Sequence, residues 1–209
     1  MAPGDQYLRW YFDTNVWKGV RYRGVRTLKN VSDMWNYQEI FSERHIGWVI
    51  ETGTRHGGSA LFFADLLNNL DAEGRVVTID VDDSAYAAPE HPRVERRLGD
   101  SADPALADEI LGALPEQRAP LFMILDSDHR TGHVLRELET WVPRLQSGDY
   151  LVVEDGIVNG HPVRPQHGPG PLEAIERFLN EHPHALVPDR VRESKFGQTF
   201  ALRGYFAVA

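Results

Sequence analysis

The chain has 209 residues and carries 31 acidic against 22 basic side chains, which gives a formal net charge of −9. Hydrophobic residues make up 42% and charged residues 25%. This is the composition of a globular domain, and it excludes a collagenous, coiled-coil or wholly disordered chain. The acidic balance disfavours nucleic-acid binding, which needs a basic face. The absence of cysteine excludes disulfides, thiolate metal sites and cysteine nucleophiles.

No apolar run approaches the roughly 20 residues that a membrane-spanning helix needs. The first six residues, Met1 to Gln6, show neither the basic region nor the apolar stretch of a signal peptide. We therefore expect a cytoplasmic protein with no membrane partner.

The first part of the chain combines aromatic and basic residues. Aromatic side chains crowd residues 7–17, and basic side chains follow over residues 18–29. This segment is expected to be either an arm packed on the domain or a lid or oligomer contact. Ser32 can cap a helix that runs through Phe41. The apolar stripe of that helix comprises Met34, Trp35, Tyr37, Ile40 and Phe41. We assign residues 1–46 to this N-terminal arm and helix.

From Trp48 onward, apolar strands alternate with helices. Expected strands are 48–50, 75–79, 94–98, 121–125 and 150–153, with closing strands at 199–202 and 205–208. Expected helices are 59–70, 104–114, 133–145 and 171–179, and Pro143 can shorten the third. This order predicts an α/β domain over residues 47–209 with a Rossmann-like, doubly wound, mostly parallel sheet.

Four of these strands end in carboxylates, and ligands of such sheets bind beyond the carboxyl ends of the strands. The first strand runs into Glu51-Thr52-Gly53-Thr54-Arg55-His56-Gly57-Gly58-Ser59, a glycine-rich turn that opens a helix. Asp80 ends the next strand and can accept hydrogen bonds from a ribose diol. Glu51 would repel a pyrophosphate but attract the ammonium group of a methionine. The pattern therefore favours S-adenosylmethionine over a nicotinamide cofactor. The candidate contacts are Glu51, Gly53, Thr54, Gly57, Ser59 and Asp80.

Gly99-Asp100-Ser101 follows the third strand. Asp100 and Ser101 could bind the adenine amino group, or they could instead belong to the cap of the next helix.

A second group of acids follows the fourth and fifth strands. Asp126-Ser127-Asp128-His129 and Glu154-Asp155 come to adjacent strand ends in this topology. Crowded carboxylates repel one another, and a divalent cation relieves the repulsion; oxygen ligands favour Mg²⁺ or Ca²⁺ over zinc. The alternative is an acidic rim paired with Arg and Lys. His129 is the best-placed general base, ahead of His133 and His161.

These motifs resemble the cephalosporin hydroxylase and rhamnosyl O-methyltransferase family of class I methyltransferases. The resemblance is carried by the combination of several stretches in one order. They are Asp33 to Glu39, Glu51 to Ala60, Leu125 to His129, His133 to Leu135, Tyr150 to Asp155, Asn159 to Val163, Gly168 to Pro171 with Glu173-Ala174, and Arg203 to Tyr205.

The resemblance implies a methyltransferase that uses S-adenosylmethionine and Mg²⁺. Transferred onto this chain, it makes Asp128, Glu154 and Asp155 the metal ligands and places Asp126 beside the cofactor, with Asp126 as the rival of Asp128 for the metal. It also implies a homo-oligomer and an acceptor hydroxyl on a glycosylated natural product, a polyketide or a glycolipid, as in antibiotic biosynthesis. Trp10, Tyr11, Trp17 and Tyr22 could stack on such an acceptor or could be structural.

The leading hypothesis is thus a Mg²⁺-dependent O-methyltransferase in which Asp128 and His129 act at the acceptor oxygen. Two alternatives stand beside it. One is a non-catalytic, S-adenosylmethionine-binding subunit of a biosynthetic complex. The other is a hydroxylase, although the H-x-D/E signature of non-haem iron sites follows none of the nine histidines.

Overall fold

The computed structural model describes residues 3–208 of the chain, so the outermost residues of the predicted arm and domain, 1–2 and 209, lie outside it. The N-terminal elements are α1 (Pro3–Asp13), the 3₁₀ turn η1 (Val16–Gly19), β1 (Arg21–Tyr22), β2 (Val25–Arg26) and α2 (Val31–Arg44). The next are β3 (Trp48–Thr52), α3 (Gly58–Asn69), β4 (Val76–Asp80), β5 (Val94–Leu98) and α4 (Pro104–Gly112). They continue with β6 (Leu121–Leu125), α5 (Thr131–Trp141), η2 (Val142–Arg144), β7 (Tyr150–Val153) and α6 (Pro171–Glu181). The last are β8 (Val187–Pro188), α7 (Arg190–Ser194) and β9 (Tyr205–Ala207).

Seven strands form one sheet in the order β5-β4-β3-β6-β7-β9-β8. The strands from β5 to β7 are parallel, whereas β9 pairs antiparallel with both β7 and β8. The mostly parallel sheet predicted from the alternation of strands and helices is therefore confirmed. Because parallel strands need crossover connections, helices cover both faces.

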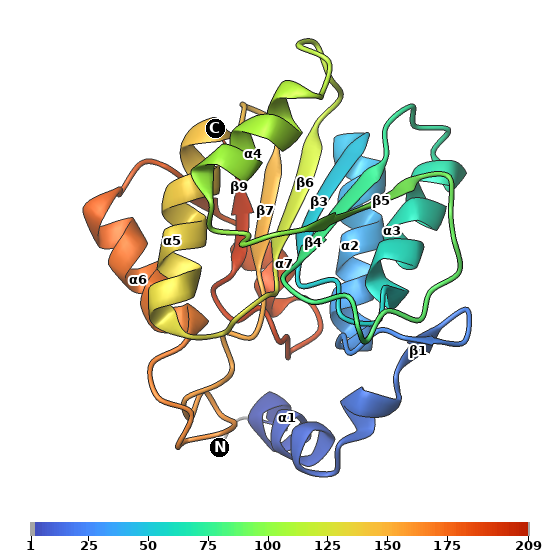
Figure 1. Ribbon diagram of the computed structural model, residues 1–209. Helices are drawn as coiled ribbons and strands as arrows, with labels where there is room; N and C mark the ends of the chain where they lie inside the picture. Colours follow the sequence, from blue (N-terminus) through green and yellow to red (C-terminus); the bar gives the residue numbers. More distant parts are fainter. Residues whose placement is uncertain (1–2, 209) are drawn as a thin grey trace.

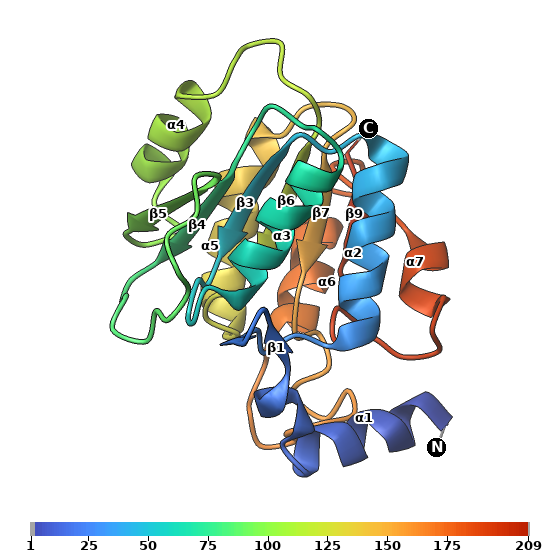
Figure 2. The same ribbon diagram turned by 90° about the vertical axis from the view of Figure 1, so that its right-hand side faces the viewer.

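Two apolar cores lie on opposite sides of the sheet. One joins the sheet to α4, α5 and α6 around Trp141, and the other joins it to α2 and α3 around Phe41 and Phe63. Figures 1 and 2 show these helices as two layers with the sheet between them. Thus α2, which we grouped with the arm by its position in the chain, packs in the helix layer of the sheet.

Three local predictions differ from the structure. The helix α2 begins at Val31, and Asn30 rather than Ser32 caps it, because its side chain accepts a hydrogen bond from the Ser32 amide. Trp35 is 58% exposed instead of buried in the stripe of α2. Residues 199–202 form no strand, because the Phe200 amide donates to the Asp33 carboxylate and is not available to a strand partner.

The arm consists of α1, η1 and the β1–β2 hairpin, and it lies at one end of the sheet, beside the loops that follow the strands (Figure 1). The α1 helix packs Leu8 and Tyr11 against Ile157, Val158 and Phe200. These contacts form a third, smaller core that holds the arm against the loops after β7 and before β9. None of the helices within residues 3–208 combines the length and apolarity needed to cross a membrane.

Candidate active site

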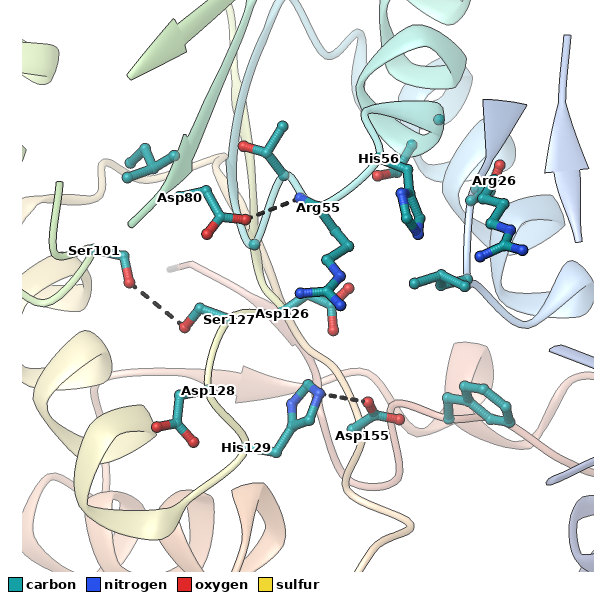
Figure 3. A pocket seen from close by; sticks show the side chains of 18 of the residues that line it. Arg26, Arg55, His56, Asp80, Ser101, Asp126, Ser127, Asp128, His129 and Asp155 are labelled. Carbon is teal, nitrogen blue, oxygen red and sulfur yellow. Dashed lines mark hydrogen bonds and ion pairs between the residues drawn. The ribbon is translucent and has the colours of Figure 1, made fainter. Parts of the chain in front are cut away.

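A cavity of about 520 Å³ lies at the carboxyl ends of the parallel strands. This volume is in the range of small-molecule sites, about 300–1,000 Å³. The glycine turn lines one part of the cavity, the acids after β6 and β7 line its middle, and the arm lines the rest. Figure 3 shows the polar residues that converge on it. The strand-end position predicted for the site therefore coincides with a real cavity.

The glycine turn brings the backbone close to the floor of the cavity. Gly53 has φ +85°, and a Cβ at this position would lie 2.0 Å from the Asp126 carbonyl oxygen, so only glycine fits. Gly57, also at positive φ, precedes the first residue of α3. Gly53, Thr54 and Ser59 line the cavity, whereas Gly57 shapes the turn beside the Tyr86 ring.

Glu51 does not line the cavity. Its carboxylate is fully buried beneath the turn and accepts a hydrogen bond from the Thr78 hydroxyl at 2.7 Å. Its Oε1 atom has no hydrogen-bond partner among residues 3–208. Burial raises the pKa of Glu51 to about 7. The geometry therefore makes Glu51 a support for the turn, with one unsatisfied oxygen below the cavity floor.

Asp80, at the end of β4, lines the cavity and accepts hydrogen bonds from the backbone amides of Arg55 and Asp82 at 2.9 and 3.2 Å (Figure 3). Of the second pair of predicted cofactor contacts, Asp100 and Ser101, one lines the cavity and the other does not. Ser101 lines the cavity, whereas Asp100 is absent from its wall and accepts from the Ala102 amide, as a turn residue does. Asp80 and Ser101 thus line the cavity together with the polar turn residues Thr54 and Ser59.

The middle of the cavity holds two carboxylates and a histidine that could share an ion. Ligand atoms of Asp126, His129 and Asp155 all lie within 4.8 Å of one another. His129 Nε2 is 3.0 Å from Asp155 Oδ2. Asp128 points to the other side of His129 and accepts from the Arg130 amide, so it does not join this group (Figure 3). Of the two aspartates that the sequence left as rivals, the structure places Asp126 in the group.

Glu154 is buried behind the cavity and belongs to a network that the sequence reasoning missed. It accepts a hydrogen bond from the Tyr37 hydroxyl at 2.5 Å and lies 3.3 Å from the Lys29 ammonium. Lys29 also contacts Asp126 Oδ2 at 2.5 Å, and only 2% of its side chain is exposed. Lys29 follows the hairpin of the arm, so a residue that reads as part of a basic surface run in fact ties the arm to the acids.

The charges of these groups shift one another's pKa. Burial alone would lower the pKa of Lys29, but Asp126 and Glu154 raise it above its ordinary value. Burial raises the pKa of Glu154 to about 8 despite the opposing charge of Lys29. Burial also opposes protonation of His129, yet the Asp155 carboxylate raises its pKa to about 9. The pKa of Asp155 is lowered because His129 outweighs the effect of burial.

The other candidate bases are engaged elsewhere. His133 lies on the cavity wall, with its Nε2 3.2 Å from the Ser101 hydroxyl. His161 is absent from the wall of this cavity and pairs with Glu173 at 3.1 Å. Of these histidines, His129 is the one grouped with carboxylates at the centre of the cavity.

The donors fit a hard divalent cation. Asp126 and Asp155 offer carboxylate oxygens to a cavity with room for water or substrate oxygens, which is the environment that Mg²⁺ accepts, whereas the imidazole of His129 is a ligand that transition metals prefer. A non-haem iron site of the facial type needs two histidines and one carboxylate, whereas this group has the reverse composition.

A mostly parallel sheet with a glycine turn after its central strand, and an acid after the next, is typical of class I methyltransferases. The family described as Rhamnosyl O-methyltransferase/CmcI matches residues 14–208. The rhamnosyl O-methyltransferase of Mycobacterium tuberculosis is 45% identical over 206 residues, which cover 98% of this chain and 84% of that protein. The Mycobacterium leprae protein of the same name is 43% identical over 205 residues, covering 96% and 88%.

A solved structure described as CmcI with Mg and S-adenosylmethionine shares the fold, with a TM-score of 0.72. It is 24% identical in sequence, and the match covers 92% of this chain and 77% of that one. The chain belongs to the Rhamnosyl O-methyltransferase/CmcI family and is an S-adenosylmethionine-dependent O-methyltransferase.

Proposed function

We propose that this enzyme transfers a methyl group from S-adenosylmethionine to a sugar hydroxyl of a glycosylated natural product or glycolipid, with Mg²⁺ held at Asp126 and Asp155. The observation that supports it most is the meeting of the glycine turn, Asp80 and the Asp126–His129–Asp155 group in one cavity. The name of the mycobacterial relatives supports a sugar acceptor, and the Mg in the CmcI structure supports the cation.

The glycine turn and Asp80 would bind the methyl donor, with Asp80 accepting from the ribose diol. Mg²⁺, when bound, would lower the pKa of the acceptor hydroxyl and fix its position. Asp126 and Asp155 would supply carboxylate oxygens to the ion. Glu154 would lie buried behind these aspartates, in contact with Tyr37 and Lys29. We prefer Asp126 to Asp128 in this set because Asp126 shares the cluster with Asp155.

His129 would take the proton of the acceptor. Its Nε2 faces Asp155, which orients the ring and leaves Nδ1 as the nitrogen that can accept a proton. The Asp155 carboxylate would also stabilise the imidazolium that forms. A cation held by Asp126 and Asp155 would lower the pKa of His129 by repulsion, which favours the neutral base at physiological pH.

The first experiment is calorimetric titration of S-adenosylhomocysteine into the protein with and without Mg²⁺, followed by transfer of a labelled methyl group to phenyl α-L-rhamnopyranoside. We expect cofactor-product binding, a separate Mg²⁺ signal that Asp155→Asn abolishes, and Mg²⁺-dependent methylation of the glycoside. Failure to bind S-adenosylhomocysteine would contradict the assignment of the glycine turn. Binding without transfer to any sugar or polyketide hydroxyl would favour a non-catalytic accessory subunit.

The expected homo-oligomer and the cytoplasmic location stay predictions. Light scattering of the purified protein tests the first, and fractionation of the producing cell tests the second.

A further inference from the structure

Four polar side chains meet at one corner of the cavity, on the face of the sheet that α5 covers. Ser101 follows β5 and Ser127 follows β6. His133 and Glu137 lie one turn apart on α5. Ser101, Ser127 and His133 line the cavity, whereas the side chain of Glu137 lies behind them and is only 1% exposed. We call these four residues the Glu137 corner.

Glu137 binds both serine hydroxyls through one carboxylate oxygen. The Ser101 hydroxyl donates to Glu137 Oε1 at 2.6 Å, and the Ser127 hydroxyl donates to the same oxygen at 2.7 Å. The two hydroxyl oxygens lie 3.5 Å apart (Figure 3), at the long limit of a hydrogen bond, so the shorter contacts hold both hydrogens. Since a serine hydroxyl has a single hydrogen, each serine oxygen is left as an acceptor.

The hydrogen of the His133 imidazole is also used within the corner. Its Nδ1 atom is 3.1 Å from Arg136 Nη2 and accepts from it, because a guanidinium can only donate. The hydrogen of the neutral ring is then on Nε2. This atom lies 3.2 Å from the Ser101 hydroxyl oxygen and 3.6 Å from Glu137 Oε1. His133 therefore donates to its neighbours in the corner.

The Glu137 corner thus presents hydrogen-bond acceptors to the cavity, since its side-chain hydrogens are used internally. Ser101 is 5% exposed, and its oxygen already faces His133. Ser127 is only half-buried, and its oxygen keeps lone pairs for a ligand. An acceptor held in this way binds an amino group and disfavours a carbonyl oxygen, which would leave both oxygens unpaired and in repulsion.

The place of the corner in the sheet indicates which part of the cofactor it meets. The strand order β5, β4, β3 puts Ser101 beyond Asp80, on the side away from the glycine turn. With the ribose at Asp80 and the methionine at the turn, the group beyond the ribose is the base. Ile79 and Val81, on either side of Asp80, also line the cavity, and the 74% exposed Val81 offers an apolar contact to a flat ring.

We propose that Glu137 is a positioning residue that sets the base selectivity of the enzyme. It holds the hydrogens of Ser101 and Ser127, so that Ser127 accepts from the 6-amino group of adenine and a 6-oxopurine is rejected. This inference rests on the proposed placement of the cofactor in the cavity. The sequence offered Asp100 and Ser101 for the adenine amino group, and the corner adds Ser127 as the acceptor and Glu137 as the residue that orients it.

The test compares two ligands that differ at this one position of the purine. S-Adenosylhomocysteine has an amino group at C6, and S-inosylhomocysteine has an oxygen there. Calorimetry measures the affinity of both for the wild type, Glu137→Leu, Ser127→Ala and Glu139→Leu. Glu139 is the matched control, because it is an exposed glutamate on the same helix. Thermal unfolding checks that each variant is folded.

We expect the wild type to bind S-adenosylhomocysteine at least about 30-fold more tightly than S-inosylhomocysteine. In Glu137→Leu the freed hydroxyls can rotate and donate to the 6-oxygen, so this ratio should fall below about fivefold. Ser127→Ala should lower the ratio to the same range, because the acceptor itself is removed. Glu139→Leu should keep the ratio of the wild type.

Equal affinity of the wild type for the two ligands would overturn the proposal and leave the proposed O-methyltransferase function intact. A Glu137 that only supports the fold would weaken both ligands by the same factor. An unchanged ratio in folded Glu137→Leu would therefore overturn the proposal, and so would an unchanged ratio in Ser127→Ala, whether or not Glu137→Leu folds. Wild-type protein that binds neither ligand would contradict the assignment of the glycine turn and, with it, this inference.

Discussion

The two ends of the cavity are built in different ways. The end where we propose that the cofactor binds, called the cofactor wall, comes from the strand–turn–helix unit β3–α3 and the ends of the next two strands, and the close approach of its backbone depends on the conformation of Gly53. The other end, where we propose that the acceptor binds and which we call the acceptor wall, combines side chains from α1, η1, the β7 loop and the segment before β9. Backbone geometry within one strand–turn–helix unit thus shapes one end of the cavity, whereas side chains brought together from distant segments shape the other.

The largest effect is expected in the middle of the cavity, between the two walls. Here Asp155 and Asp128 lie on either side of His129. Asp155→Asn should lower the methyl-transfer rate about 10³-fold, the cost of losing one preorganised charge at a reacting centre. Asp128→Asn should change it less than threefold, because Asp128 lies outside the Asp126–His129–Asp155 group. Single-turnover rates with saturating S-adenosylmethionine measure both. A loss larger than threefold in Asp128→Asn would instead support Asp128, Glu154 and Asp155 as the metal ligands.

Lys29 connects the acceptor wall to the acids, and its removal tests that connection. Lys29→Met leaves Asp126 and Glu154 without their buried counter-charge, and breaking such a pair costs about 3–5 kcal/mol of unfolding free energy. Urea unfolding measures the loss. Lys18→Met is the control, because Lys18 is exposed beside the Trp17 ring, and it should cost less than about 1 kcal/mol. Equal stability of the two variants would contradict the anchoring role.

The substitution Asp80→Ala is expected to weaken binding at the cofactor wall and to leave binding at the acceptor wall unchanged. Loss of hydrogen bonds to a charged group, about 1.5–3 kcal/mol, predicts S-adenosylhomocysteine affinity lowered roughly 10- to 100-fold. Glycoside binding should not change. Asp82→Ala, two residues further in an exposed position, should leave both affinities intact. Calorimetry measures both affinities. An unchanged S-adenosylhomocysteine affinity in Asp80→Ala would show that Asp80 does not bind the cofactor.

The smallest effect concerns the loop between β7 and α6, which supplies Val158 and Arg164 to the acceptor wall. Glu173 accepts hydrogen bonds from Asn159 and from the Gly170 amide and pairs with His161. Although burial opposes it, this bonding lowers the pKa of Glu173 to about 2, below the ordinary value of about 4.3. The resulting stabilisation is complete above about pH 4.3 and is lost as pH falls toward 2.

Glu173→Gln should therefore be slightly less stable than wild type at pH 7, and the difference should shrink between pH 4 and pH 2. Thermal unfolding across this range measures it, with the exposed Glu181→Gln as control. A difference that stays constant with pH would show that the carboxylate charge does not hold the loop.

The sequence could predict the elements whose signals are local. Strands β3, β4, β6 and β7 and helices α3, α4, α5 and α6 follow the predicted order closely, because buried parallel strands read as apolar runs between helices. The partly exposed edge strand β5 was also predicted, although its sequence is not an apolar run. The cavity also lies at the expected edge, since parallel strands bring their carboxyl ends together. The strand predicted at 199–202 was wrong because Asp33, far away in the chain, binds the backbone there.

The sequence by itself determined the family, the sheet and the edge of the sheet at which the cavity lies, since each depends on contiguous motifs or on the order of the elements. Only the tertiary structure decided that Asp126 and not Asp128 joins His129 and Asp155, because both aspartates lie in the irregular loop after β6, where the backbone conformation and not a strand period sets the direction of each side chain. It also decided that Lys29 is buried and that Trp17 faces the cavity while Tyr11 does not. These outcomes depend on the packing of residues more than 90 positions apart, as in the pairing of Lys29 with Asp126, and no local pattern encodes it.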